Sequence, residues 1–207
     1  KKKLFRTPIL SEKDLYPRKN FSLSEKIKIL RVSWLLPTKG LEYLIRSIAE
    51  LKNTGYNLEL SIVGESKDPK YRNILNKLVI GLDLTNEVKF LGWKSKKDLD
   101  NYYINYDIHV ISSLSEGTPR VILEGMSKAI PTICTKVGGV EDFLNHGIDS
   151  LLIEPGSEKS ISNALSTLIN DIDLRKRISI NGFNSAKKWT IEKQSKNILR
   201  DMKLMLK

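Results

Sequence analysis

The sequence has few of the residues that metal sites and disulfides need. Cys134 is its single cysteine, and His109 and His146 are its two histidines. One cysteine excludes an intrachain disulfide, and neither histidine has a partner at metal-ligand spacing, so we expect no metal site. Cys134 stands in an apolar run, which is typical of a buried strand residue. Because cysteine-poor chains suit a reducing compartment, we expect a cytoplasmic protein.

Long apolar runs and long blocks of like charge are also missing. No segment approaches the roughly 20 apolar residues that span a bilayer. The net charge is +11, yet the lysines are spread along the chain, with small clusters at 1–3, 94–97 and 187–188. We interpret most of this charge as a solvated surface, with peripheral contact to the inner membrane face as the alternative. No recognition motif accompanies the charge, so we expect no nucleic-acid partner.

Strand-like and helix-like segments alternate along most of the chain. Residues 1–24 show no sustained periodicity and contain Pro8 and Pro17, so we expect a linker or an N-terminal arm there. Residues 25–189 are predicted to form one domain, and 190–207 a C-terminal helix. Strands are expected at 27–33, 58–63, 88–91, 108–111, 132–135 and 150–153. Helices are expected at 41–51, 71–80, 96–103, 119–128, 140–145, 157–169, 171–187 and 191–206.

This alternation predicts an α/β fold, a Rossmann-like parallel sheet with helices on both faces. In such sheets a ligand binds at the carboxyl ends of the strands, where the strand order reverses. The loops that begin at Gly64, Gly92, Ser113 and Lys136 all follow predicted strands. We therefore expect these loops to lie along one edge of the sheet.

Two glutamates eight positions apart are the most informative feature of the sequence. Glu116 lies in a glycine-containing turn and Glu124 in the predicted helix that follows. Thr118 can cap this helix, and Pro119 suits its first position. The amides around Gly117 would then point unpaired into the space before the helix, where they attract anions such as phosphate. Two carboxylates beside an anion site suit a ligand with both phosphates and sugar hydroxyls, such as a nucleotide sugar.

The pattern E-G-x-P followed by a second Glu resembles the E-x7-E motif of retaining glycosyltransferases of the GT-B fold, especially glycosyltransferase family 4. Three later segments, 129–133, 137–142 and 147–156, are similar in order to the family's G-x-P-V-V, V-G-G-x-x-E and G-x-x-G-x-L-x-x-P-G segments. The resemblance runs from about residue 27 to about residue 199. Each motif alone is weak, and their ordered series is strong.

The resemblance implies roles for the residues of the two-glutamate motif. Glu116 would act in catalysis by hydrogen-bonding to the donor sugar, and Glu124 would accept hydrogen bonds from the ribose. The alternatives are a simple charge at a helix start for Glu116 and, for Glu124, an ion pair with Arg120 one helical turn earlier. The donor would also contact the helix start, at Gly117, Thr118, Pro119 and Arg120.

Three other segments also resemble donor-binding loops. Lys39 lies in a turn similar to the family's x-P-x-K-G turn, where a lysine stabilises charge on the leaving diphosphate. Trp93 and Lys94 follow a strand as in the family's F-L-G-x-V loop, whose backbone meets the base. Trp93 would either stack on the base or be an ordinary surface or core tryptophan. Gly64 would allow the backbone to approach the ligand closely.

One departure from the family pattern concerns the phosphate site. The family has a Gly-Arg pair just upstream of the lysine, and Ser33 and Trp34 occupy those positions here. The second phosphate-binding cation is therefore missing. Arg31 is near in sequence, but on a strand we expect it to face the opposite side from Trp34. Arg120 is the residue that we consider as a substitute.

The resemblance implies the donor-binding, C-terminal half of a GT-B glycosyltransferase, so an N-terminal acceptor-binding domain is the expected partner. The whole enzyme would move a hexose from a nucleoside diphosphate sugar to a hydroxyl acceptor, without a cofactor or a required metal, in cell-surface polysaccharide synthesis. Two alternatives stay open: a non-catalytic module that binds nucleotide sugars, and a GT-B nucleotide-sugar epimerase. Fold alone does not separate them.

Overall fold

A six-stranded parallel sheet forms the centre of the protein. The computed structural model describes residues 10–117 and 120–205. The strand order is β3-β2-β1-β4-β5-β6, so the order reverses between β1 and β4. The strands are β1 (Ile27–Val32), β2 (Leu58–Val63), β3 (Val88–Gly92), β4 (Ile108–Ile111), β5 (Thr132–Thr135) and β6 (Leu151–Ile153). The expected α/β fold with a Rossmann-like parallel sheet is confirmed.

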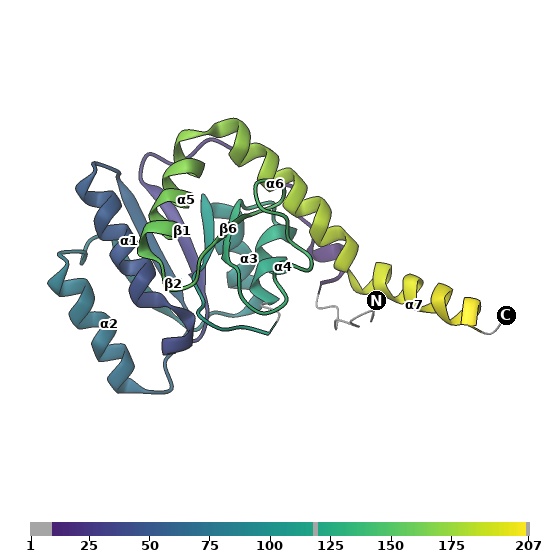
Figure 1. Cartoon of the computed structure of the whole chain (residues 1–207), viewed down its shortest axis with the longest axis horizontal. Helices are drawn as coiled ribbons and strands as arrows, with labels where there is room; N and C mark the ends of the chain where they lie inside the picture. The colour runs from purple at the N-terminus through teal and green to yellow at the C-terminus, as the bar shows by residue number, and fades with distance from the viewer. Residues whose placement is uncertain (1–9, 118–119, 206–207) are drawn as a thin grey trace.

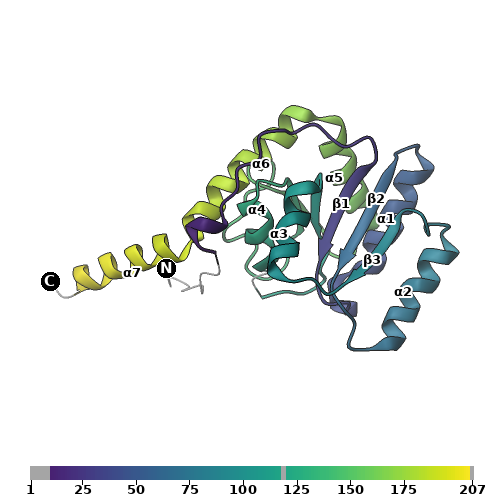
Figure 2. The ribbon, with the colours of Figure 1, turned by 180° about the vertical axis from the view of Figure 1, so that it is seen from behind.

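Helices cover both faces of this sheet, as expected. On one face, α1 (Leu41–Asn53), α2 (Pro69–Gly81) and α5 (Glu158–Asn170) bury their apolar side chains in the main core. On the other face lie α3 (Lys96–Asn105) and α4 (Arg120–Ser127). Figures 1 and 2 view these two layers from opposite sides. The strands are covered on both faces, which explains why apolar residues make up much of each strand.

Short polar residues set the starts of several helices. The side chains of Asp68, Ser95, Ser157 and Asp171 each accept a hydrogen bond from a backbone N–H in the first turn of α2, α3, α5 and α6 (Ile172–Ala186). Such caps satisfy N–H groups that have no partner within the helix. They explain why these helices begin where the sequence pattern placed them to within two residues.

The N-terminal segment 10–24 packs along the domain. Its Arg18 donates hydrogen bonds to the carbonyls of Ile104, at 3.0 Å, and of Tyr106, at the end of α3. These carbonyls have no helical partner, so the guanidinium caps the helix. Leu10 forms a bridge with Thr190, just before α7 (Ile191–Met205). Beyond this contact α7 extends away from the sheet (Figure 1).

One expected helix is wrong. The segment Val140–Asn145 forms turns, in which the Leu144 N–H donates to the Val140 carbonyl at 3.0 Å. The next N–H, of Asn145, instead donates to the Asp149 carboxylate at 2.8 Å. This side chain replaces the helical acceptor, so the chain leaves the helical path after one turn.

Candidate functional site

The strand order reverses between β1 and β4, which places the loops after these two strands side by side at the carboxyl edge of the sheet. β1 leads to α1 on one face, and β4 leads to α4 on the opposite face. The connecting segments 33–40 and 112–117 therefore begin at the ends of neighbouring strands. This is the point at which open α/β sheets bind their ligands.

Lys39 and Glu116 meet at this edge of the sheet. The Lys39 Nζ lies 2.7 Å from the Glu116 Oε1, and the Ser113 Oγ donates to the same oxygen at 2.8 Å. The side chains of the ion pair are 17% and 15% exposed, so a ligand can reach both. The structure thus brings together the two residues predicted to act in catalysis.

Gly40 allows the loops that carry this pair to approach each other. Its φ angle is +60°, and a Cβ atom there would lie 2.1 Å from the carbonyl oxygen of Ser112. A hydrogen bond of 2.8 Å from the Leu114 N–H to the Thr38 carbonyl joins the same two loops. A side chain at position 40 would force them apart, so glycine sets the distance between Lys39 and Glu116.

Arg31 lies beneath the ion pair, at the carboxyl end of β1. It is fully buried, and its Nη2 donates to the Ser113 Oγ at 2.9 Å and to the Lys39 carbonyl at 3.3 Å. Burial lowers the pKa of Arg31 to about 10, and the nearby Glu116 charge opposes this shift. The Trp34 ring is on the surface, 48% exposed, with the Lys67 Nζ 5.2 Å from its centroid.

Glu124 lines a cavity of about 300 Å³ between α3, α4 and the N-terminal segment, and neither Lys39 nor Glu116 is among the residues that line it. Trp93, Lys94 and Tyr103 also line it, and the Tyr103 hydroxyl donates to Glu124 at 3.2 Å. Burial raises the pKa of Glu124, although this hydrogen bond and the Lys96 charge oppose the rise. Three predicted donor-binding residues thus share one cavity.

Other predicted site residues are placed differently. Gly64 has a φ angle of +134°, and a Cβ atom there would lie 1.9 Å from the Ser33 carbonyl oxygen. The glycine is therefore required by packing between the ends of β1 and β2. Gly117 has open space where a Cβ would be, and Arg120 is exposed at the start of α4. Thr118 and Pro119 lie outside the described residues.

Sequence reasoning missed Ser113 and the position of Arg31. Ser113 was expected only as the start of a loop, yet it bonds to both Arg31 and Glu116. The available signal was the charged Arg31 inside an otherwise apolar strand end, beside Leu30 and Val32. A buried charge in such a strand requires polar partners, and the polar residues after β4 were the nearest supply.

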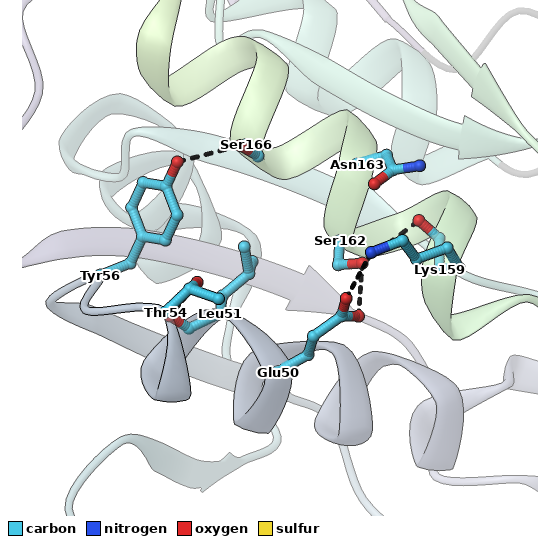
Figure 3. A pocket seen from close by; sticks show the side chains of 8 residues that line it. All are labelled: Glu50, Leu51, Thr54, Tyr56, Lys159, Ser162, Asn163 and Ser166. Carbon is cyan, nitrogen blue, oxygen red and sulfur yellow. Dashed lines mark hydrogen bonds and ion pairs between the residues drawn. The ribbon is translucent and has the colours of Figure 1, made fainter.

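A further pocket of about 270 Å³ lies between α1 and α5 (Figure 3). Its polar groups bind one another: Lys159 pairs with Glu50 at 2.7 Å, and the Ser162 hydroxyl donates to the same carboxylate at 2.6 Å. Glu50 is near the end of α1, which begins at the carboxyl edge, so this pocket lies toward the opposite edge of the sheet. It is separate from the Lys39–Glu116 pair.

The described residues provide neither a metal-binding cluster nor a membrane-spanning helix. Across 10–117 and 120–205, no three histidine, cysteine, aspartate or glutamate side chains are grouped so as to hold a metal ion. In the same part of the chain, none of the helices has the length and the apolar character needed to cross a membrane.

Comparisons with known proteins place the chain in a family. The family model "Glycosyl transferases group 1" matches residues 12–185. CapM, a capsular polysaccharide biosynthesis glycosyltransferase of Staphylococcus aureus, is 28% identical over 160 residues, 77% of this chain and 41% of CapM. The structure of HepE from Anabaena in complex with UDP matches with a TM-score of 0.79 and 25% identity, over 86% of this chain and 49% of that one.

A shorter solved structure has the same fold along its whole length. The C-terminal domain of LpcC, a group 1 family protein of Francisella tularensis, matches with a TM-score of 0.79 and 24% identity. The match covers 88% of this chain and 99% of that domain. By contrast, the chain spans about half or less of the length of its curated relatives.

Proposed function

Because the chain belongs to the group 1 glycosyl transferases, we propose that it is the donor-binding half of a retaining glycosyltransferase. The whole enzyme would transfer a hexose from a nucleoside diphosphate sugar to a hydroxyl acceptor. The observation that carries this proposal is the Lys39–Glu116 pair at the strand-order reversal, with the Glu124 cavity on the α3–α4 side. Phosphate, sugar and nucleoside groups would each have a complementary partner.

Lys39 is the proposed partner of the donor diphosphate. Its ammonium is partly exposed and pairs with Glu116. A diphosphate carries more charge than one carboxylate, so it competes for the ammonium. As the bond to the sugar breaks, negative charge grows on the leaving diphosphate, and Lys39 would stabilise this charge. Glu116 would remain to accept hydrogen bonds from the sugar hydroxyls.

The cavity at Glu124 is the proposed nucleoside site. Glu124 would accept hydrogen bonds from the ribose, while the exposed Trp93 ring offers a surface on which the base can stack. Lys94 stands beside this ring and adds positive charge. HepE was solved with UDP, so UDP is the first nucleotide to test here. We propose no cofactor and no required metal, since the lysine supplies the positive charge.

A second protein segment would complete the enzyme by binding the acceptor. The likeness to the C-terminal domain of LpcC and the half-length matches support this division. In α7 the side chains of Ile191, Ile198, Leu199 and Met202 are exposed, and we propose that the missing half covers them. The role named for CapM supports surface polysaccharide synthesis as the process.

The test is a calorimetric titration with UDP, GDP and ADP. We expect one nucleotide to bind, and Lys39→Met and Glu124→Gln to weaken that binding. The matched controls are Lys159→Met and Glu50→Gln, which break an ion pair in the α1–α5 pocket. Equal weakening by the controls, or no binding by the wild-type chain at millimolar nucleotide, would contradict the proposal.

One observation favours a second candidate, a non-catalytic module that binds nucleotide sugars. Trp34 replaces the second phosphate-binding cation of the family, and its ring is exposed. The two candidates differ in the behaviour of the completed enzyme. Release of free UDP from UDP-hexose by the chain together with its N-terminal half supports the transferase, whereas tight binding without turnover supports the module. A change of sugar configuration without release would identify an epimerase.

A further inference from the structure

Arg31 is a buried charge that the fold does not need. It stands at the end of β1, where Leu30 and Val32 are buried and apolar, and its own exposure is 0%. Its Nε and Nη1 have no hydrogen-bond partner. A buried guanidinium with unpaired N–H groups destabilises a protein, and apolar residues of similar volume are often better tolerated. Retention of such a residue therefore calls for a reason outside folding.

The contacts of Arg31 lead directly to the proposed donor site. Its Nη2 donates to the Ser113 Oγ at 2.9 Å, and this hydroxyl donates to the Glu116 Oε1 at 2.8 Å. The same Nη2 lies 3.3 Å from the carbonyl oxygen of Lys39. One side chain is thus linked to both members of the Lys39–Glu116 pair. It remains inaccessible to any ligand because the pair and its loops cover it.

The charges of Arg31, Lys39 and Glu116 explain how Arg31 can act on the donor site. Glu116 is stabilised by Lys39, whose Nζ lies 2.7 Å from its Oε1. When Lys39 turns to a diphosphate, Glu116 would lose its direct counter-ion in a poorly hydrated place, which is costly. Arg31 remains in place, and its charge acts on Glu116 through Ser113. Arg31 also adds a positive charge close to the proposed donor site. At the surface of that site, Trp34 stands in place of the family's second phosphate-binding cation.

We propose that Arg31 is a positioning residue of the donor site, the permanent counter-cation that holds Glu116 and releases Lys39 to bind the donor diphosphate. This inference rests on the proposed donor-binding function. The family carries a second phosphate-binding cation at the position of Trp34. This inference assigns that positive charge to Arg31, a core residue three positions earlier.

A purely structural role for Arg31 makes a different prediction. If its hydrogen bonds held the loops together, removing them would lower stability. Its partners, however, keep other bonds, since the Lys39 carbonyl also accepts from the Ser112 Oγ at 3.0 Å. The Ser113 hydroxyl also keeps its bond to Glu116. Replacing Arg31 by methionine therefore leaves neither partner without a hydrogen bond and removes two buried nitrogens that have no acceptor.

The experiment compares Arg31→Met and Arg31→Lys with the wild-type chain by thermal unfolding and by UDP titration. We expect Arg31→Met to unfold at or above the wild-type temperature while its Kd for UDP rises roughly 10-fold, the effect of one charge-assisted interaction. Arg31→Lys keeps the charge and should recover part of the affinity. Unchanged UDP affinity in Arg31→Met, or a loss of affinity with a matching fall in unfolding temperature, would overturn the proposal.

A double-mutant cycle separates this inference from the proposed function. In a Glu116→Gln background no carboxylate needs a counter-cation, so Arg31→Met should weaken UDP binding less than it does in the wild type. If the wild-type chain binds no UDP, GDP or ADP, the proposed function fails. The same cycle is then read in unfolding free energy, where coupling between Arg31 and Glu116 supports the positioning role and additivity overturns it.

Discussion

Glu124→Gln is the substitution that separates binding from stability most clearly. The carboxylate lies in the α3–α4 cavity, where burial raises its pKa. The folded state then binds the proton more tightly than the unfolded state does. The contribution of Glu124 to stability is therefore full below its unfolded pKa and is lost as the pH rises through the folded value. Glutamine keeps an oxygen for the Tyr103 hydroxyl and carries no charge, so the variant should not share this loss.

The same substitution should weaken nucleotide binding. A hydrogen bond to a charged acceptor contributes about 1.5–3 kcal/mol and a neutral one about 0.5–1.5 kcal/mol. The ribose would thus lose about 1–1.5 kcal/mol for each hydroxyl bound to Glu124. For one to two such bonds, UDP affinity falls roughly 5-fold to 150-fold.

Two assays check this prediction. Calorimetry measures the Kd for UDP, and chemical denaturation between pH 4 and 8, a range of about 4 pH units that spans the usual titration of glutamate, measures the free energy of unfolding. We expect the variant to gain stability relative to the wild type as the pH rises, and to bind UDP more weakly at neutral pH. A variant that binds UDP as tightly as the wild type would refute the assignment of Glu124 to the nucleoside site. A constant stability difference across the pH range would refute the argument from burial.

Three further predictions concern the base, the loops and the core. Trp93→Ala should cost about 1–3 kcal/mol of UDP binding, as loss of a stacking surface does, and should affect inorganic diphosphate binding little, both measured by calorimetry. Gly40→Ala should lower the unfolding temperature more than Gly55→Ala, because both glycines have positive φ but only Gly40 faces a backbone oxygen, at 2.1 Å. Ile48→Ala should lower the unfolding free energy by about 2–5 kcal/mol, whereas Ile80→Ala, at a side chain 67% exposed, should change it little. Equal effects within either matched pair would contradict the packing described.

The sheet could be predicted from the sequence because its signal is local. The strands are short segments rich in apolar residues and bounded by turn residues, as in 58–63, and the helices show apolar residues at helical spacing. The motif residues Lys39 and Glu116 follow strands, so their meeting at one sheet edge was predictable from the alternation alone. Their contact depends further on Gly40, whose positive φ lets two loops approach.

The remaining features depend on contacts between distant parts of the chain. The docking of residues 10–24 rests on Arg18 reaching the end of α3, and no periodic pattern records such a contact. The Val140–Asn145 segment has a helical sequence pattern, but Asp149 takes the N–H of Asn145. Arg31 was visible as a charge in a strand, while its partner Ser113 became evident only from the pairing of β1 with β4.

A crystal structure of the chain with UDP tests the central claim most directly. The account predicts the diphosphate within hydrogen-bond distance of the Lys39 Nζ, the ribose hydroxyls on Glu124 and the uracil against Trp93. Glu116 should then keep its bond to Ser113, with Arg31 unmoved beneath it. UDP bound elsewhere, such as in the α1–α5 pocket, would contradict the account. UDP bound at the carboxyl edge of the sheet without contact to Lys39 and Glu124 would also contradict it.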